Sequence, residues 1–309
     1  MKVISDAAAL QPGPRPVCAA IGVFDGVHLG HQHVLRQTIS DAAGQQAVSA
    51  VVTFDRHPNA VVAPASVPPL IYPLAKKLEV IASLGVEAAY VIRFDKAFSQ
   101  IPGEQFIRDL ARDFQRITSI CVGDGFMFGA GRSGNVALLQ KLGGELGFTL
   151  RALRDVELDG QSVSSTRIRD TVRAGDFVLA GRMLGRPYAL CGTVIKGEQL
   201  GRKLGFPTAN LDIAGLLVPP TGVYAAEAQI GTGQWRAAVN IGHRPSVRSA
   251  DHQLHVEAHL LDFEKDIYGQ ALALVFLKKL RDEKKFPTPE ILRAQIADDI
   301  SQVRSLAVP

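Results

Sequence analysis

The sequence predicts two domains of different class, an α/β domain with a parallel sheet followed by an antiparallel β-barrel. The chain has 309 residues, more than one hydrophobic core usually organises. Its first half alternates apolar runs with helical patterns, whereas its second half holds short alternating runs separated by Gly, Pro and Asp. We place the boundary near Gly185–Pro187, which gives domains of residues 1–185 and 186–309.

Continuous apolar runs in the first half predict buried strands at residues 16–24, 47–54, 88–94 and 117–123. Helical patterns lie between or after them, over His31–Ala43, Leu74–Leu84, Gly103–Phe114 and Asn135–Leu146. Apolar strands joined by amphipathic helices are typical of a parallel sheet with helices on both faces. We therefore expect ligands to bind beyond the carboxyl ends of these strands.

Alternating runs in the second half predict an antiparallel sandwich or barrel, with strands at residues 189–197, 222–231, 234–242, 253–262 and 271–280. A last helical pattern, Pro289 to Val303, follows them. No low-complexity linker separates the halves.

The composition predicts a globular protein and excludes a disordered chain, since 47% of its residues are hydrophobic and 21% are charged. The net charge is +4, but the basic residues form no long tract of the kind that binds nucleic acid or acidic lipid. Cys18, Cys121 and Cys191 are widely spaced, which favours reduced thiols over disulfides. The N-terminus lacks a secretory signal pattern, and no run of about 18 apolar residues occurs, so we expect a soluble, cytoplasmic protein.

The stretch GVFDGVHLGH, residues 22–31, is the first candidate site. It surrounds His28 and His31 with Gly22, Gly26 and Gly30. The histidines could be satisfied core residues or metal ligands, but glycines add nothing to a core, and zinc needs further ligands that this stretch lacks. Glycines let a backbone approach phosphates closely, and the following helix offers free N–H groups to them. The pattern therefore favours a phosphate site in which two imidazoles donate hydrogen bonds.

The stretch SSTRIR is the second candidate site. It places the hydroxyls of Ser164, Ser165 and Thr166 at a predicted helix start, followed by Arg167 and Arg169. A helix N-cap would explain one of these hydroxyls. Three hydroxyls and two arginines suit a triphosphate better than a cap alone.

The third candidate site is the glycine-rich basic loop that ends in GFPTANL. Gly197, Lys203 and Gly205 are suited to phosphate binding, although such loops are weak evidence by themselves. Thr208 and Asn210 offer oxygen ligands that suit a hard cation such as Mg²⁺. The alternative is a turn in which both side chains bond their own backbone.

The run LHVEAHLLD places His255, Glu257 and His259 on one face of a predicted strand. With His252 they could form a metal site, and Glu257 could simply face solvent. We favour an interpretation in which Glu257 faces a substrate and acts as a general base.

These motifs resemble, in order, those of the bacterial bifunctional riboflavin kinase/FMN adenylyltransferase family. HLGH is similar to the HxGH signature of nucleotidyltransferases. In the first half the resemblance rests on GVFDGVHLGHQ, VVTFDRHP, VGDGFMFGAGRSGN and VSSTRIRDTVRAGD. In the second half it rests on GTVIKGEQLGRKLGFPTANL, PPTGVYAAEA, VNIGHRPSV, HVEAHLLDF, DIYG and LRDEKKF. It spans about Val17 to Asp299.

The resemblance implies a Rossmann-like nucleotidyltransferase domain and a Greek-key barrel with a terminal helix. The barrel would phosphorylate riboflavin with ATP to FMN, and the first domain would adenylylate FMN to FAD with release of pyrophosphate. Mg²⁺ is the implied cofactor, with riboflavin, FMN and ATP as the partners, and neither nucleic acid nor membrane is expected. The oligomeric state is left open.

Site residues follow from the same resemblance. The implied catalytic residues are Glu257, His28 and His31. The implied ATP- and phosphate-binding residues are Gly22, Phe24, Asp25, Gly26, Gly30, Ser164, Ser165, Thr166, Arg167, Gly197, Lys203 and Gly205. The implied flavin-binding residues are Phe126, Phe128 and Arg281, and the implied metal ligands are Thr208 and Asn210. Core packing beside a glycine loop is an equal alternative for either phenylalanine.

Two other functions compete with the bifunctional enzyme. The family usually has Asp or Asn where this chain has Gly125, so the chain could be a riboflavin kinase with weakened or lost adenylyltransferase activity. The basic pI of about 9.0 and the synthetase-like HLGH motif would also suit a non-catalytic nucleotide- or RNA-binding protein. Such a protein has little use for a candidate base and a separate cation loop.

Overall fold

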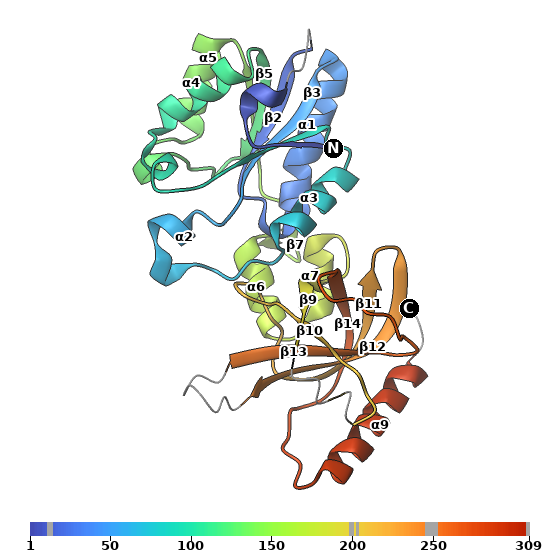
Figure 1. Cartoon of the computed structure of the whole chain (residues 1–309). Helices are drawn as coiled ribbons and strands as arrows, with labels where there is room; N and C mark the ends of the chain where they lie inside the picture. Colours follow the sequence, from blue (N-terminus) through green and yellow to red (C-terminus); the bar gives the residue numbers. More distant parts are fainter. Residues whose placement is uncertain (11–14, 198–200, 202–203, 245–252, 307–309) are drawn as a thin grey trace. The chain divides into compact units, whose positions relative to one another are not determined.

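The computed structural model describes residues 1–10, 15–197, 201, 204–244 and 253–306 (Figure 1). It divides into two compact units, Met1–Ser165 and Thr166–Pro309. None of the helices in the described part of the chain is long and apolar enough to cross a membrane.

A six-stranded sheet forms the centre of the first unit, in the order β1-β4-β3-β2-β5-β6, and every pair of neighbours is parallel. The strands are β1 (Lys2–Ile4), β2 (Val17–Ile21), β3 (Val48–Phe54), β4 (Ala88–Ile92), β5 (Ile117–Gly123) and β6 (Thr149–Leu153). From β2 the chain continues to β3 and β4 on one side of β2, and it then crosses to β5 on the other side of β2. Such a switch point opens a crevice at the carboxyl ends of the two strands, where α/β sheets bind ligands.

Helices cover both faces of this sheet, as Figure 1 shows. On one face lie α1 (Leu29–Gln45) and α3 (Leu74–Ser83), and on the other lie α4 (Gly103–Asp113) and α5 (Val136–Leu146). Successive residues of β2 serve the two sides, since Ala20 packs with α1 and α3 while Ala19 and Ile21 pack with α4 and α5. All five residues of β2 are buried, which accounts for its continuous apolar sequence.

Shorter elements complete the first unit. They are the helix α2 (Asn59–Val62), the hairpin of β7 (Glu157–Leu158) and β8 (Gln161–Ser162), and the 3₁₀ turns η1 (Ala7–Leu10), η2 (Asp25–Val27), η3 (Pro64–Ser66), η4 (Phe98–Gln100) and η5 (Ala130–Arg132).

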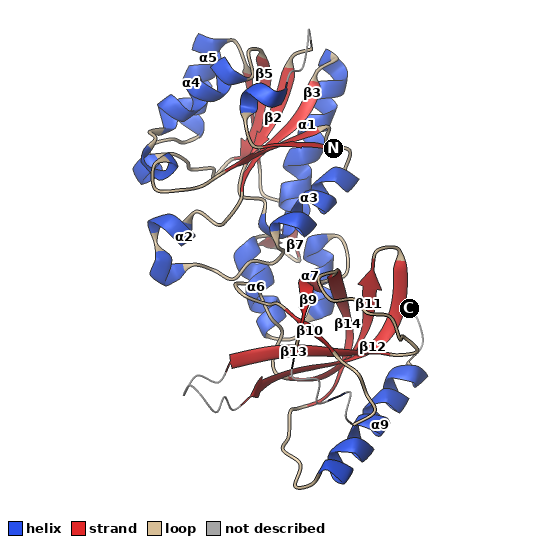
Figure 2. Cartoon of the chain, in the orientation of Figure 1, coloured by secondary structure: helices blue, strands red, loops and turns tan. Residues whose placement is uncertain are grey.

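The second unit is a closed antiparallel barrel in the order β10-β13-β12-β11-β14-β9 (Figure 2). Its strands are β9 (Ala189–Ile195), β10 (Ala209–Leu211), β11 (Gly222–Ile230), β12 (Gly233–Arg244), β13 (Gln253–Leu260) and β14 (Ala271–Arg281). Strands β11, β12 and β13 follow one another, and β10 lies beside β13, which is the Greek-key arrangement. The helices are α6 (Ser165–Arg173), α7 (Phe177–Leu184) and α9 (Pro289–Ser305).

Two apolar clusters hold the helices of this unit against the barrel. The ring of Phe177 in α7 stacks on Tyr188 and on Phe276, with centroids 6.0 and 5.1 Å apart. On α9, Val303 packs with Ala225 of β11 and Leu261. Burial of such side chains supplies most of the driving force for helix docking.

The predicted fold class is confirmed, including the parallel sheet, the antiparallel barrel and the terminal helix. Strands β1, β6, β7, β8 and β10 were not predicted. Strand β10 has three residues inside the loop that ends in PTAN, too few to show an alternating pattern. Helices α6 and α7 precede Gly185 but are grouped with the barrel. The expected domain boundary near Gly185 stays a prediction.

Candidate functional site

The turn between β2 and α1 carries the first candidate site and has an unusual backbone. Phe24, Gly26 and Val27 have φ angles of 54°, 77° and 43°. Left-handed conformations at residues other than glycine are strained and persist only where the surroundings enforce them. Here the Asp25 carboxylate accepts hydrogen bonds from the backbone N–H of Ile71 at 3.0 Å and of Tyr72 at 3.4 Å. The conformation of the turn is therefore fixed from the side of α3.

The glycines of this turn make room for side chains of the turn itself. A Cβ atom on Gly22 would lie 3.1 Å from the Phe24 ring, and one on Gly30 would lie 3.2 Å from the His28 ring. A Cβ atom on Gly26 would lie 2.9 Å from Ile71. We expected the glycines to admit phosphate, which stays a prediction, and the structure shows that they make room for packing within the turn.

His28 and His31 form a stacked pair at the start of α1. Their ring centroids are 3.6 Å apart with 22° between the planes, and the backbone N–H of His31 donates to Nδ1 of His28 at 3.4 Å. The ring of His31 also meets the Phe24 ring edge-on at 5.2 Å. Its Nδ1 atom is buried and has no hydrogen-bond partner among the described residues. One imidazole nitrogen at this helix N-terminus thus has an unused capacity for a hydrogen bond within the described part of the chain.

Burial holds the pKa of His31 well below its usual value of 6.5, and the nearby His28 and Lys77 lower that pKa further. His31 is therefore neutral at physiological pH. A neutral imidazole still donates one hydrogen bond, which suits it to stabilise charge that develops on a phosphoryl oxygen.

Lys77 of α3 lies beneath this turn and was not singled out from the sequence. Its side chain is buried, and Nζ donates to Val23 O at 3.1 Å, to Thr53 Oγ1 at 3.0 Å and to Phe54 O at 3.0 Å. Burial lowers the pKa of Lys77 to about 8. The amine ties the carboxyl ends of β2 and β3 together where ligands are expected. In the sequence, Lys77 appears only as one lysine among the apolar positions of an amphipathic helix. Lysines are common on helix surfaces, so this pattern does not mark a buried amine.

The structure brings Ser165 to the histidine turn. Its hydroxyl donates to Asp25 O at 3.0 Å, and Val163 O would lie 3.6 Å from a Cβ atom on Gly30. The loop that begins SSTRIR therefore packs on the first turn of α1 through residues 163–165. Thr166 and Arg167 belong to the second unit, where Arg167 O accepts a hydrogen bond from the Thr171 hydroxyl within α6.

The loop after β5 carries the two phenylalanines predicted to bind flavin. The rings of Phe126 and Phe128 stack at 5.2 Å. Phe128 is buried in the core of the unit, where Gly103 and Gly134 leave room for its ring. Phe126 is half-buried against that core, so its ring is the more accessible of the two. Gly125 is exposed and has open space where a side chain would be.

In the barrel, the candidate base and a candidate metal ligand lie side by side. Asn210 of β10 pairs directly with Glu257 of β13, and Glu257 pairs on its other side with Asn240 of β12. Directly paired residues of antiparallel strands point to the same face, with Cβ atoms about 5 Å apart. The row Asn210, Glu257, Asn240 therefore gathers amide and carboxylate oxygens on one face. Asn240 was not predicted.

The side chains of Thr208 and Asn210 occupy space left open by glycines of the preceding loop. A Cβ atom on Gly197 would collide with the Asn210 amide, and one on Gly201 would lie 3.2 Å from Thr208 Oγ1. These donors are neutral oxygens, which fit Mg²⁺ when phosphate oxygens complete its coordination. In the described part of the chain, no three His, Cys, Asp or Glu side chains are grouped so that they could hold a metal. Gly205 is exposed with φ of 90°, and Lys203 lies outside the described residues.

A cavity of about 370 Å³ opens beside this loop. Its lining includes Pro207 and Thr208 of the loop, Ala258 of β13, and the rings of Phe263 and Tyr268. Aromatic walls next to phosphate-binding groups are suited to a nucleobase with its phosphates directed at Thr208.

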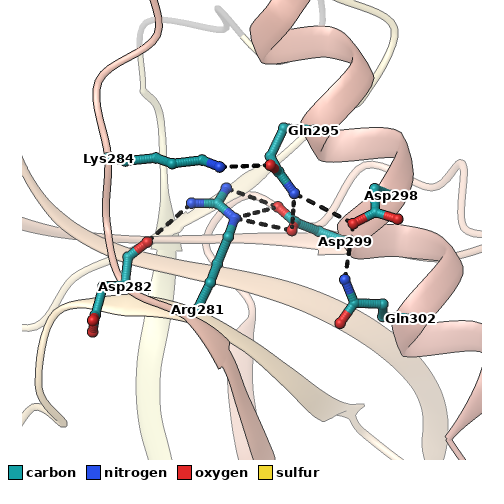
Figure 3. A network of polar contacts seen from close by, with 7 residues as sticks. All are labelled: Arg281, Asp282, Lys284, Gln295, Asp298, Asp299 and Gln302. Atoms are coloured by element: carbon teal, nitrogen blue, oxygen red, sulfur yellow. Dashed lines mark hydrogen bonds and ion pairs between the residues drawn. The ribbon is translucent and has the colours of Figure 1, made fainter.

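Arg281, predicted to bind flavin, is engaged with α9 (Figure 3). Its Nη2 donates to Asp299 Oδ2 at 2.8 Å, its Nε donates to Asp299 Oδ1 at 3.0 Å, and its Nη1 donates to Asp282 O at 3.1 Å. Gln295 donates to the same carboxylate, and Lys284 donates to Gln295 Oε1 at 2.7 Å. The guanidinium thus holds α9 against the end of β14, and its flavin contact stays a prediction.

Comparison with known proteins finds matches for both units. A model of the FAD synthetase family matches residues 10–167, and a model of the riboflavin kinase family matches residues 184–307. The chain is 38% identical over 309 residues to a bifunctional riboflavin kinase/FMN adenylyltransferase from Pseudomonas fluorescens, covering 100% of this chain and 99% of the relative. It is 37% identical over 302 residues to the Escherichia coli K12 protein with the same description, covering 97% and 96%. A crystal structure described as a macrolide-efflux protein from Streptococcus pneumoniae aligns with a TM-score of 0.81 and 26% identity over 99% of both chains.

Proposed function

The chain belongs to the family of bifunctional riboflavin kinase/FMN adenylyltransferases, and we propose how its residues divide that work. The domain of residues 186–309 phosphorylates riboflavin with ATP to give FMN and ADP. The domain of residues 1–185 joins FMN and a second ATP to give FAD and pyrophosphate. The activities divide near Gly185–Pro187, and the substrates are small molecules of the cytoplasm.

In the kinase reaction, Glu257 takes the proton from the 5′-hydroxyl of riboflavin as that oxygen attacks the γ-phosphorus of ATP. Support comes from its place beside Asn210, which directs both side chains to one face. The cavity beside Thr208 receives the adenosine of ATP. Thr208 and Asn210 hold Mg²⁺, which neutralises charge on the phosphates when it is bound.

In the adenylyl transfer, a phosphate oxygen of FMN attacks the α-phosphorus of ATP, and pyrophosphate leaves. No nucleophile of the protein is needed. His28 and His31 donate hydrogen bonds to the transferring nucleotide, and the N–H groups at the start of α1 face its phosphates. Ser164, Thr166 and Arg167 hold the departing pyrophosphate. The single observation that supports this assignment most is the buried, unpartnered Nδ1 atom of His31 at a helix N-terminus.

One incubation tests both reactions. The purified protein is mixed with riboflavin, excess ATP and Mg²⁺, and the flavins are separated over time. FMN should appear first and FAD should follow. FMN that accumulates without FAD at saturating ATP would favour a kinase with weakened adenylyltransferase activity, an alternative motivated by Gly125. Absence of both products would contradict the proposal.

A further inference from the structure

His259 makes a contact that neither predicted reaction uses. Its Nδ1 atom lies 2.8 Å from the carbonyl oxygen of Pro207, and its ring meets the Phe206 ring edge-on with centroids 5.8 Å apart. A carbonyl oxygen only accepts, so Nδ1 carries the hydrogen in this bond. His259 therefore donates a hydrogen bond to the backbone of the residue directly before Thr208.

The carbonyl that His259 binds belongs to the peptide group between Pro207 and Thr208. This peptide group orients Thr208, the proposed metal ligand. The ring of Pro207 fixes its φ angle, so the direction of the Thr208 amide depends on the ψ angle of Pro207. A hydrogen bond to the Pro207 carbonyl restricts that angle. On the other side of the turn, the backbone N–H of Phe206 donates to Gly201 O at 2.8 Å. The turn is thus anchored at both ends, internally at Phe206 and to the barrel at Pro207.

The side chain of His259 lies on the face of β13 that is turned away from the cavity. Ala258 and Leu260 line the cavity next to Thr208, and their neighbour His259 on β13 points to the opposite face of the strand. Glu257 shares that opposite face with His259. One strand thus carries both the proposed base and the support of the metal-binding turn. The pairing of Ala209 with Ala258 sets the register between them.

From these contacts we propose that His259 is a positioning residue for magnesium and phosphate binding, which it controls through the Pro207 carbonyl. This inference rests on the proposed role of Thr208 as a Mg²⁺ ligand. It predicts that a donor at the Nδ1 position matters, and that the size and aromaticity of the imidazole matter less.

Two substitutions separate the donor from the side chain as a whole. In His259→Asn the amide nitrogen takes the place of Nδ1, whereas His259→Ala has no donor. The chain contains a single tryptophan, Trp235, whose ring meets the cavity-lining Phe263 edge-on at 4.9 Å. Its fluorescence therefore reports occupation of the cavity without turnover. ADP is titrated with Mg²⁺ and with EDTA, and FMN formation is measured in parallel.

His259→Ala should weaken ADP binding in Mg²⁺ by about tenfold, the scale of one lost hydrogen bond to a ligand-holding turn. Its ADP affinity in EDTA and its FAD formation from FMN should match those of the wild type. His259→Asn should restore the Mg²⁺-dependent affinity. Equal weakening in Mg²⁺ and EDTA, no weakening at all, or an Asn variant as poor as Ala would overturn the proposal.

Thr208→Ala distinguishes this inference from the assignment on which it rests. If Thr208→Ala leaves the effect of Mg²⁺ on ADP binding unchanged, the metal-ligand assignment is wrong. If Thr208→Ala abolishes that effect while His259→Ala retains it, the metal ligand stands and the role of His259 is wrong. Should His259→Ala fail to fold, the Asn variant still tests the proposal, because an Asn variant that loses the wild-type dependence of ADP binding on Mg²⁺ would overturn it.

Discussion

Asn210 and Glu257 are directly paired residues of neighbouring antiparallel strands, although they lie 47 positions apart in the sequence. The pairing places an amide and a carboxylate on one face, at the edge of a loop whose glycines make room for the amide. A group suited to hold Mg²⁺ thus lies next to a group suited to accept a proton. This relationship connects two motifs that lie far apart in the sequence.

Glu257→Gln should lower FMN formation by about 10²- to 10⁴-fold, the usual contribution of a general base. The amide keeps the size of the side chain but accepts no proton, so riboflavin binding should remain. FAD formation from added FMN should be unchanged, because the first unit carries that reaction. Separation of flavins from parallel incubations with riboflavin or FMN measures both. Unchanged FMN formation would mean that another group is the base.

His31→Ala should lower FAD formation by about 10²- to 10³-fold, as expected when one donor to a developing charge is removed. The deleted ring stacks on that of His28, with centroids 3.6 Å apart, so His28→Ala should lower FAD formation to a similar extent. Because the two rings are in contact, the double variant should lose less activity than the product of the two single losses. FMN formation is the internal control. Loss of both activities to the same extent would contradict independent sites.

Gly125→Asn should increase FAD formation relative to FMN formation. Position 125 follows β5 at the switch point beside β2, and nothing lies within 4 Å of the Cβ atom that Asn would add. One added hydrogen bond to a substrate would lower the KM for FMN or ATP by about fivefold. Steady-state rates of FAD formation against each substrate measure this. An unchanged or higher KM for both substrates would show that Gly125 does not limit the reaction.

Much of the fold was predictable because the buried strands of the first unit consist almost entirely of apolar residues. Strand β3 was predicted at residues 47–54 and runs from Val48 to Phe54, with six of its seven residues buried. Strand β6 was missed because its residues are exposed or half-buried and lack that signature. Hydrophobic periodicity reports burial, so it cannot find a strand at the edge of a sheet.

The candidate site was predictable where a motif is local, and it was not predictable where function depends on pairing. The residues around His28 are contiguous, so their grouping followed from the sequence alone. Lys77 and His259 reach their partners through tertiary structure, since Lys77 bonds residues 23 to 54 positions away and His259 bonds Pro207, 52 positions away. Strand register and helix docking determine those contacts, and neither leaves a pattern in a single sequence.

Asp299→Asn should destabilise the second unit by about 3 kcal/mol, because it leaves the half-buried guanidinium of Arg281 without its carboxylate. Asp262→Asn is a matched control, since Asp262 pairs with Arg304 of the same helix at the exposed surface. That variant should melt at nearly the wild-type temperature. Thermal unfolding followed by circular dichroism compares the two. Equal destabilisation by both substitutions would contradict the special role of the buried pair.

Lys77 should make the stability of the first unit depend on pH in the alkaline range. Burial lowers its pKa to about 8 from 10.5, so between these values the unfolded chain holds a proton that the folded chain has released. The free energy of unfolding should therefore rise from pH 8 to pH 10.5, by at most about 3 kcal/mol at 1.36 kcal/mol per pKa unit. Below pH 8 the amine is charged in both states, and the cost of burying it is fully present.

Lys77→Met should remove this rise, so the difference in unfolding free energy between variant and wild type should change between pH 7.5 and pH 10. At pH 7.5 the variant should already be less stable, because the carbonyl groups of Val23 and Phe54 lose their donor. Lys76→Met removes the adjacent amine, which pairs with Glu79 at the helix surface, and it should follow the wild-type curve. Urea unfolding monitored by circular dichroism at both pH values measures these differences. If Lys77→Met keeps the full alkaline rise, the buried amine is not its source, and the rise must come from other groups.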